Sequence, residues 1–560
     1  GVGALVDWGL IGYVGTHASY DGTTIEGDGG SVAWSVHRTG AGDVLYIFPT
    51  NGIWGQMRAF GTGAQAPWAR NAGGELYSTI ARVVVSPGVR AGEATEGMFE
   101  HCTSLVEADL RNLQIGPMTT SLAGMFEGCA SLRHVTQGGP SDDATGKVML
   151  PEPAPQGSGA SARFMDTSGV VSAMRMFAGC SGLEDEGGTL AVDLSGGASK
   201  ALFERDGVAL RGLFEGAMAT APASVHIDGA ANGRAADAEG MFKGATGMTR
   251  VTLASMANGR GASISRAFEG CATLAKATLT DVANGQAADM TYLFKGVMTD
   301  ASAPDKSVDI SFRETGLGGT STGGGADMSH MFEGAFSTSL DPGSKVAFAE
   351  LPREGITVER VEGMLYAGAG RESLLPAADL RGLPAVSGAS DANIRDLLRN
   401  MGAVTCVTNK HADAEAFEGA AGAPLTEVWL PHAWDTTALK DASNMARGMG
   451  ALLSFDTTDL IRARTGTKMT SMLADCPSLT EAIFDAGDVT TPGRHGATPR
   501  ALDIAPGRAS DMTEMFARSE RLSYIDFYGL GTIGMGTSEA GDANITGQAR
   551  MFEGCTSMVK

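Results

Sequence analysis

The chain has 560 residues and a formal charge of −22, because 64 Asp and Glu outnumber 42 Lys and Arg. This charge argues against a nucleic-acid partner, since phosphate binding needs a basic face, and it discourages contact with anionic membranes. The sequence also lacks an apolar run of the ~18 residues that a membrane-spanning helix needs.

Residues 1–92 carry no repeated motif and hold four of the six tryptophans. Two alternating apolar segments, 31–36 and 44–48, flank a glycine-containing loop at 39–43, which predicts a β-hairpin. Residues 82–85 form the next expected strand. We therefore expect residues 1–92 to be a β-rich cap that covers one end of a repeat domain.

From residue 93 to residue 560, versions of the segment Met125–Leu132 recur about fifteen times. Near copies start at Met98, Met176, Met241, Met331, Met515 and Met551. We call the first residue of each copy the anchor. The spacing between anchors ranges from 19 residues (Leu397 to Ala416) to 51 residues (Met125 to Met176). Such a period is typical of stacked repeats.

Each repeat combines a helix signal with a strand signal. Asp327 stands four residues before the anchor Met331, and Gly334 follows it, so the pair could cap a helix of less than two turns. A helix this short is unstable alone, and neighbouring repeats must hold it. The alternating segment Val251–Leu253 predicts the strand that follows. The expected fold is an α/β solenoid of helix–strand coils with a parallel sheet on one face.

Proline-rich and glycine-rich stretches interrupt the repeats, and we expect them to loop out because they suit neither helices nor central strands. These expected insertions are residues 137–165, 314–326, 490–508 and 529–545. The alternative for the first of them is a loop around a degenerate coil. Within the second, residues 316–325 are glycine-rich but lack the Lys-Ser/Thr ending of a phosphate-binding loop.

Six of the seven cysteines occupy one position, four residues after the anchor, where other repeats have alanine. A position that accepts either residue is a small buried site, so we expect packing and neither metal binding nor catalysis. The sequence shows no nucleophile beside a base, and its nine histidines show no metal-ligand spacing. We expect no enzyme, no catalytic residue, no resident metal and no cofactor.

The outward residue of each expected strand should form a column on the sheet face. The column reads Asp109, Thr136, Asp193, His226, Thr252, Thr278, Asp309, Asp379, Trp429, Asp456, Ile483 and Asp526. One interpretation is a ligand face, and its carboxylates and hydroxyls would also suit a calcium ion. The other is a solvated face that keeps the sheet soluble. The candidate binding residues are the six aspartates, His226 and Trp429.

Trp429 is the strongest single contact candidate in that column. A large exposed aromatic side chain on a sheet is unusual outside binding surfaces. The alternative is that an insertion covers it.

The anchor pattern Asp-Met-x-x-Met-Phe-x-Gly-Cys-x-x-Leu, followed by a Leu-Asp-Leu-like strand, resembles the BspA-like leucine-rich repeats of bacterial surface proteins. Residues 43–52, 66–68 and 80–89 are similar to the leader that often precedes such repeats, so the resemblance runs from about residue 31 to the end. It implies a secreted or surface-exposed protein that binds matrix proteins, cells or glycans. The chain departs from the family in its irregular coil lengths and in lacking a wall-sorting tail.

Our first hypothesis is an adhesin-like interaction protein that binds a protein or glycan partner through the solenoid face, without catalysis. The alternative is a structural subunit that assembles head to tail into a fibre. It rests on the last repeat, Met551–Lys560, which stops before its strand and would leave an edge open for pairing with another copy.

Overall fold

A computed structural model describes residues 3–13, 18–22, 24–61, 64–69, 78–137, 147–153, 164–195, 202–300, 306–311, 326–337, 343–349, 357–386, 393–412, 415–420, 423–431, 439–457, 468–484, 511–526 and 550–558. The chain forms two compact units. The first unit contains residues 1–274 and 280–283, and the second contains residues 275–279 and 284–560. Each unit is treated by itself below.

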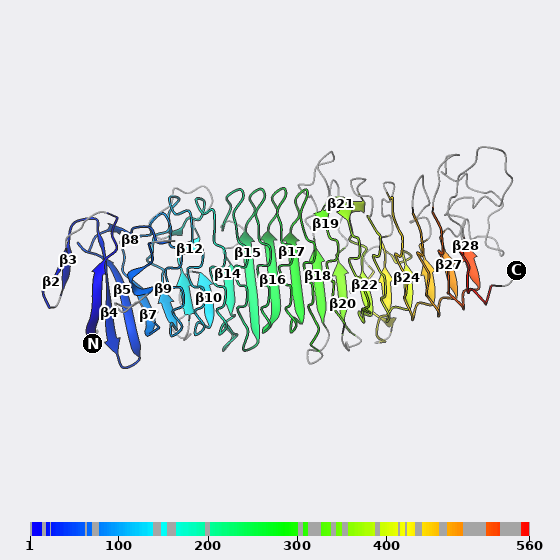
Figure 1. Ribbon diagram of the computed structural model, residues 1–560, viewed down its shortest axis with the longest axis horizontal. Coiled ribbons are helices and arrows are strands. Elements are labelled where there is room, and N and C mark those ends of the chain that lie inside the picture. Colours follow the sequence, from blue (N-terminus) through cyan, green and yellow to red (C-terminus); the bar gives the residue numbers. More distant parts are fainter. Residues whose placement is uncertain are drawn as a thin grey trace. The chain divides into compact units, whose positions relative to one another are not determined.

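The first unit is built of strands and tight turns, and Figure 1 shows the strands β14, β15 and β16 side by side. Its strands are β1 (Ala4–Leu10), β2 (Ala18–Tyr20), β3 (Ile25–Gly27), β4 (Val32–Thr39), β5 (Gly42–Pro49), β6 (Gly55–Gln56), β7 (Ile80–Val85), β8 (Val89–Arg90), β9 (Glu107–Asp109), β10 (His134–Gln137), β11 (Lys147–Leu150), β12 (Glu152–Pro153), β13 (Phe164–Met165), β14 (Val192–Ser195), β15 (Ala223–Ala230) and β16 (Met248–Met256). The main sheet of this unit has the order β1-β4-β5-β7-β9-β11-β10-β14-β15-β16. Strands β1, β4 and β5 are antiparallel, which confirms the predicted hairpin, and from β5 onward the pairing is parallel.

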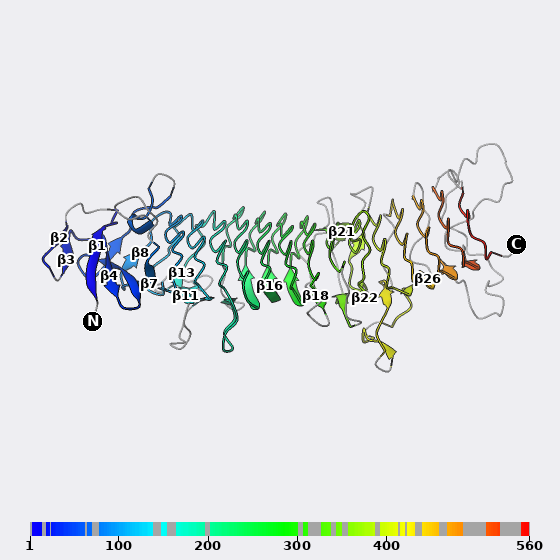
Figure 2. The same cartoon turned by 60° about the horizontal axis from the view of Figure 1, so that its bottom comes forward.

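The second unit is a parallel sheet of the same kind. Its strands are β18 (Ser307–Ser311), β19 (Ala326–Asp327), β20 (Lys345–Phe348), β21 (Thr357–Arg360), β22 (Ala377–Asp379), β23 (Ala385–Val386), β24 (Cys406–Thr408), β25 (Glu427–Trp429), β26 (Ser454–Asp456), β27 (Glu481–Ile483) and β28 (Tyr524–Asp526), while β17 (Lys276–Val282) is divided between the units. The main sheet runs β18-β20-β22-β25-β24-β26-β27-β28, and β19, β21 and β23 form a small parallel sheet. In Figure 2 the arrows of each unit's main sheet lie along one side of that unit, and turn segments lie along the other.

In each unit one strand joins the sheet out of chain order. Strand β11 lies between β9 and β10, with Val148 paired to Ala108 on one side and to Val135 on the other. Strand β25 lies between β22 and β24 in the same way. The expectation that residues 137–165 loop out is therefore wrong for Lys147–Leu150, whose four residues are all buried in the sheet. Ala326, the last residue of the expected insertion 314–326, begins β19. Residues 314–325 and the expected insertions at 490–508 and 529–545 lie outside the described residues.

The segments expected to be short helices are runs of tight turns. Within the described ranges, the only helical element is the 3-10 helix η1 (Pro67–Ala69). The backbone has positive φ one residue before the anchor and again three residues after it, as at Gly124 (60°) and Gly128 (77°). Arg175 (56°) adopts the same conformation without being a glycine. An α-helix needs φ near −63° at every residue, so a left-handed residue at every fourth position prevents one. The fold is a mostly parallel β-structure and not an alternating α/β structure.

Hydrogen bonding in the turns alternates between two directions. The amides of Phe126 and Gly128 donate to the next coil, at Met176 O and Ala178 O, both over 2.8 Å. The amide of Glu127 stays inside the turn and donates to Gly124 O at 3.1 Å. Half of the amides that a helix would need are therefore used to join coils.

The aspartate cap predicted from the sequence exists, but it opens a turn. Asp327 Oδ1 accepts a 2.9 Å hydrogen bond from the amide of Ser329, two residues later. This is the local bond that an Asx turn makes. An aspartate carboxylate can accept the first hydrogen bond of a helix or of a turn. The helix predicted from Asp327 is therefore wrong.

The core of each unit contains a stack of phenylalanine rings and all the predicted anchors except Ala416. Ala416 is exposed in the segment after β24, so the repeat predicted there is wrong. In the first unit, Phe126 and Phe177 are fully buried with centroids 5.3 Å apart and planes within 4°. Trp68 of η1 stacks against Phe99 at the start of this row, and its Nε1 donates to Met98 O at 2.7 Å. Trp68 thus closes the ring stack from within residues 1–92, which share the first unit with the early repeats.

The cysteines beside these rings are all free thiols. Cys129 Sγ donates to Phe99 O of the preceding coil at 3.1 Å, and Cys271 Sγ makes the equivalent bond to Phe242 O at 3.2 Å. Burial raises the pKa of Cys271 to about 12, so its thiol stays protonated. The small buried position inferred from the sequence is therefore a packing site with one extra hydrogen bond.

Candidate binding face on the parallel sheet

The parallel register aligns the outward residues of successive strands into one column in each unit. In the first unit the column is Asp109, Met149, Thr136, Asp193, His226 and Thr252. In the second unit it is Asp309, Ala347, Asp379, Trp429, Thr408, Asp456, Ile483 and Asp526. Thr278 lies in β17, and the side chain of Asp526 lies outside the described structure.

Sequence reasoning missed Met149, Ala347 and Thr408 as members of these columns. The alternation of Val346, Ala347 and Phe348 could have identified β20, because the first and third residues are buried and the second is not. Lys147–Leu150 gives no such signal, since all four residues are buried.

The column of the first unit is open. The side chain of Asp193 is 45% exposed and that of His226 is 34% exposed. His226 Nδ1 lies 3.4 Å from Asp193 Oδ1, an oxygen that is itself shielded from solvent and accepts no hydrogen bond from any described residue. Thr252 is exposed beside His226 in the register. These three neighbours offer a carboxylate, an imidazole and a hydroxyl to a partner.

Fixed charges mark the other end of the open column. Arg111 Nε and Nη2 donate to the two carboxylate oxygens of Asp109 at 3.0 and 2.8 Å. The hydrogen bond from Arg111 is the main reason that the pKa of Asp109 lies below its usual value. On the same strand, Glu107 pairs with Arg82 at 3.2 Å. Both signs of charge are therefore held in place on this part of the sheet.

In the second unit the part of the column around Trp429 is covered, whereas Asp309 and Ile483 are partly exposed. The expected exposure of Trp429 is therefore wrong. The Trp429 side chain is only 2% exposed. The His411 ring stacks on it with centroids 3.5 Å apart, and the Phe417 ring meets it edge-on at 4.9 Å. Both residues belong to the segment after β24, and we call residues 410–412 and 415–418 the cover segment. The alternative that an insertion covers Trp429 is the one that the structure has.

Arg381 ties the cover segment to the sheet. Its guanidinium binds both carboxylate oxygens of Asp379 at 3.0 and 2.9 Å and lies 4.6 Å over the Trp429 ring. It also donates to Ala412 O at 3.0 Å and to Glu415 O at 2.7 Å. All of its strong contacts are internal, so Asp379 has no free acceptor face like that of Asp193.

Two further ionisable side chains complete the covered site. Lys410 Nζ lies 2.6 Å from Asp456 Oδ2, which explains why that aspartate is nearly buried. Burial lowers the pKa of His411, although Glu427 and Glu415 act in the opposite direction. Glu427 also accepts the Trp429 Nε1 hydrogen bond at 2.7 Å. These contacts account for the low exposure of Asp379, Trp429 and Asp456.

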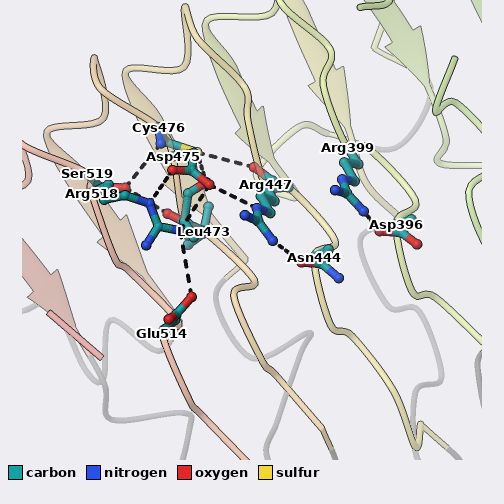
Figure 3. A network of polar contacts seen from close by, with 12 residues as sticks. Asp396, Arg399, Asn444, Arg447, Leu473, Asp475, Cys476, Glu514, Arg518 and Ser519 are labelled. Atoms are coloured by element: carbon teal, nitrogen blue, oxygen red, sulfur yellow. Dashed lines mark hydrogen bonds and ion pairs between the residues drawn. The ribbon is translucent and has the colours of Figure 1, made fainter. Parts of the chain in front are cut away.

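The turn side of the second unit carries a different polar network, drawn in Figure 3. Asp475 accepts hydrogen bonds from Arg518 and, at 2.9 Å, from Arg447 of the preceding coil. The bond from Arg518 is the largest cause of the lowered pKa of Asp475. Glu514 lies on the other side of Arg518 and also pairs with Arg550 at 2.7 Å. Arginines of the chain itself therefore neutralise the carboxylates along this edge.

Within the described ranges, no three His, Cys, Asp or Glu side chains are grouped so that they could hold a metal ion. The described part of the chain also has no helix of the length and apolarity that crossing a bilayer requires. Comparison of the sequence and structure with protein-family models, curated proteins and solved structures found no match.

Proposed function

We propose that the protein is a non-catalytic interaction protein, a solenoid that binds a protein or glycan partner through the open sheet face of the first unit. The observation that carries the proposal is the contrast in exposure between the two columns. The open column keeps Asp193, His226 and Thr252 accessible in adjacent strands, whereas Asp379, Trp429 and Asp456 of the second unit are nearly buried beside the cover segment.

The chemistry of the open face favours a polar partner. A row of carboxylate, imidazole and hydroxyl groups at strand spacing, about 4.8 Å, matches repeated hydrogen-bonding groups on an extended peptide or a glycan. Charged pairs such as Arg111–Asp109 are pre-organised, so little side-chain entropy is lost when a partner binds them. A secreted or surface-exposed location, as in BspA-like repeat proteins, belongs to the same proposal.

The test uses arrays of extracellular-matrix proteins and of glycans, probed with the full chain and with two matched variants. Thr252→Arg places a long cation in the open column, and Thr246→Arg makes the same change at an exposed residue of the same coil away from the column. We expect Thr252→Arg to weaken binding of the captured ligand by at least about tenfold, or ~1.4 kcal/mol. Thr246→Arg should change the affinity for the same ligand by less than about twofold. Equal effects of the two variants would contradict a role for the sheet face.

The alternative of head-to-tail assembly rests on residues 551–560 and stays a prediction. Light scattering of the full chain over a range of concentrations tests it. Growth into long particles would favour assembly, and a constant mass near 57.5 kDa would favour the binding function.

A further inference from the structure

The second unit has a cavity on its sheet face, beside the cover segment. Its volume is about 610 Å³, within the size range of sites for small organic ligands. The sheet contributes Lys345 and Ala377, the first residues of β20 and β22. Each stands two residues before a member of the second unit's column, so both face outward. Phe417 and the two residues after it also line the cavity, as do residues 423–425, which precede β25.

Most of this lining is apolar. The apolar residues are Ala377, Phe417, Ala423, Pro424 and Leu425. The two segments outside the sheet are in direct contact at Gly419, where a Cβ would collide with the carbonyl group of Ala423. The cavity therefore offers hydrocarbon surface on more than one side.

Lys345 is the only cation among the described residues that line the cavity. Its side chain is partly buried, and its ammonium makes no hydrogen bond or ion pair with any described residue. Glu418 also lines the cavity, but its side chain is exposed and no ion pair joins it to Lys345. An ammonium that is partly withdrawn from water without a partner costs stability. The described contacts therefore give this charge no structural role.

The equivalent strand of the first unit shows what is different here. Strands β11 and β20 both begin with Lys-Val, and both pair in the same register with a strand that ends in Ala-Asp. That register places Glu107 beside Lys147 in the first unit. In the second unit it places Ala377 beside Lys345, and Ser307 lies on the other side. The first lysine thus has a carboxylate of the chain next to it in the sheet, and the second has none.

The nearest carboxylates of β22 and β25 are already engaged. Asp379 binds Arg381 through both of its carboxylate oxygens. Glu427 accepts the indole hydrogen bond of Trp429 at 2.7 Å. Neither group is available to neutralise Lys345.

Ser344, the residue before Lys345, supplies a second donor in the lining. Its side chain is only 1% exposed, and its Oγ accepts a hydrogen bond from the amide of Lys306 at 3.1 Å. The hydroxyl proton is donated to no described residue. An anionic group at this end of the cavity would meet an unpaired ammonium and an unused hydroxyl donor.

We infer that this cavity binds a small organic carboxylic acid with an apolar body. The carboxylate would accept hydrogen bonds from Lys345, and the apolar body would contact Phe417 and Leu425. A charge-assisted hydrogen bond fixes the orientation of such a ligand, and burial of its apolar surface supplies most of the affinity. The cavity lies in the second unit, and its ligand is independent of the sheet-face function proposed for the first unit.

The experiment measures the affinity of 4-phenylbutanoate for the full chain by ligand-observed NMR titration, with the uncharged 4-phenylbutanamide as the reference. Lys345→Met keeps an aliphatic side chain and removes the charge. It should weaken binding of the acid by at least about tenfold, because the charge-assisted hydrogen bond is lost, and change binding of the amide by less than about twofold. Lys468→Met, at an exposed residue of the second unit outside the cavity, is the matched control and should change binding of the acid by less than about twofold.

Equal loss in Lys345→Met and Lys468→Met, or equal binding of the acid and the amide to the unmodified chain, would overturn the inference. Tighter binding of 4-phenylbutylamine than of the acid would also overturn it, since Glu418 would then be the deciding charge. Tighter binding of acetyl-Gly-Gly-Phe with a free carboxyl end would assign the cavity to the end of a partner peptide instead of a small molecule.

Leu425→Asn gives an independent check on the apolar part of the site. It should weaken binding of the acid and of the amide alike, because it removes apolar contact and leaves Lys345 in place. No change for either ligand would show that the ligand binds elsewhere. Hydrogen exchange at the amide of Val428 verifies that each variant is folded. The sheet-face variant Thr252→Arg should leave binding of the acid unchanged, which separates this site from the proposed function.

Discussion

The two units contain the same four residues, Ala-Asp-Leu-Arg, at 108–111 and at 378–381, and use them differently. In each unit the arginine donates hydrogen bonds to the two carboxylate oxygens of the aspartate two residues earlier, over 2.8 to 3.0 Å. In the first unit the Asp and Arg side chains are 22% and 37% exposed, and in the second they are 8% and 6% exposed. A short sequence thus sets the ion pair, but a segment about thirty residues later decides whether it faces solvent.

The difference has an energetic reason. A buried ion pair is tolerated only when its remaining donors and acceptors are satisfied, because both charges lose their hydration. Arg381 meets this condition through two carbonyl oxygens of the cover segment and the face of Trp429. Arg111 has no comparable cover and keeps part of its hydration. Exposure, and with it the capacity to bind a partner, follows from the cover segment.

The largest expected effect comes from removing the arginine in each unit. Arg381→Ala should destabilise the second unit by about 3–5 kcal/mol, since it leaves the buried Asp379 carboxylate unpaired. Arg111→Ala, the matched change in the open column, should cost about 1 kcal/mol or less. Hydrogen exchange at the amides of Val407 and Val428 measures the loss of stability in the second unit, and exchange at Ala108 measures the loss in the first unit. Similar losses of unfolding free energy in the two units would show that the difference in burial of the two ion pairs does not affect stability.

A smaller effect is expected from trimming the cover segment itself. Phe417→Ala should destabilise the cover segment by about 0.5–1.5 kcal/mol through loss of the edge-on ring contact with Trp429. The variant should also make tryptophan fluorescence more sensitive to a neutral quencher. Phe552→Ala is the control, because its ring is 39% exposed and distant in sequence from any tryptophan. Unchanged quenching in Phe417→Ala would mean that Phe417 does not shield Trp429.

The smallest effect is a pH dependence confined to the second unit. Burial lowers the pKa of His411 in the folded state, so the unfolded chain binds more protons once the pH drops below the usual histidine value of about 6.5. The stability that neutral His411 contributes is complete above that pH and declines as the pH falls through the folded pKa. The protection factors of the cover-segment amides, which correct exchange rates for their intrinsic dependence on pH, should therefore be smaller at pH 5 than at pH 8. His411→Phe, which keeps a stacked ring, should remove that difference, and a persisting difference would assign it to other groups.

The sequence was sufficient to predict most of the strands, although not β11, β20 or β24, and most of the buried anchors. Those features depend on local alternation, and the pairing of His226 with Asp193 and Thr252 follows from it directly. The helices were predicted wrongly because Asp327 and Gly334 are equally suited to cap a helix and to form tight turns. The choice is made by hydrogen bonds to neighbouring coils, such as that from Phe332 N to Met364 O, which a single repeat does not reveal.

The candidate site was predictable only in part. The column residues were identified from the alternation, but the burial of Trp429 depends on His411, Phe417 and Arg381, which lie 12 to 48 residues away in sequence.

Carboxylate labelling of the native chain, with a carbodiimide and a small amine, tests the contrast between the two columns most directly. Mass spectrometry would compare Asp193, which is open on the first unit, with Asp379, which is paired and covered on the second. The account predicts rapid labelling of Asp193 and protection of Asp379 until the second unit is unfolded, with protection lost in Arg381→Ala. Labelling of Asp379 in the native chain as fast as that of Asp193 would contradict it.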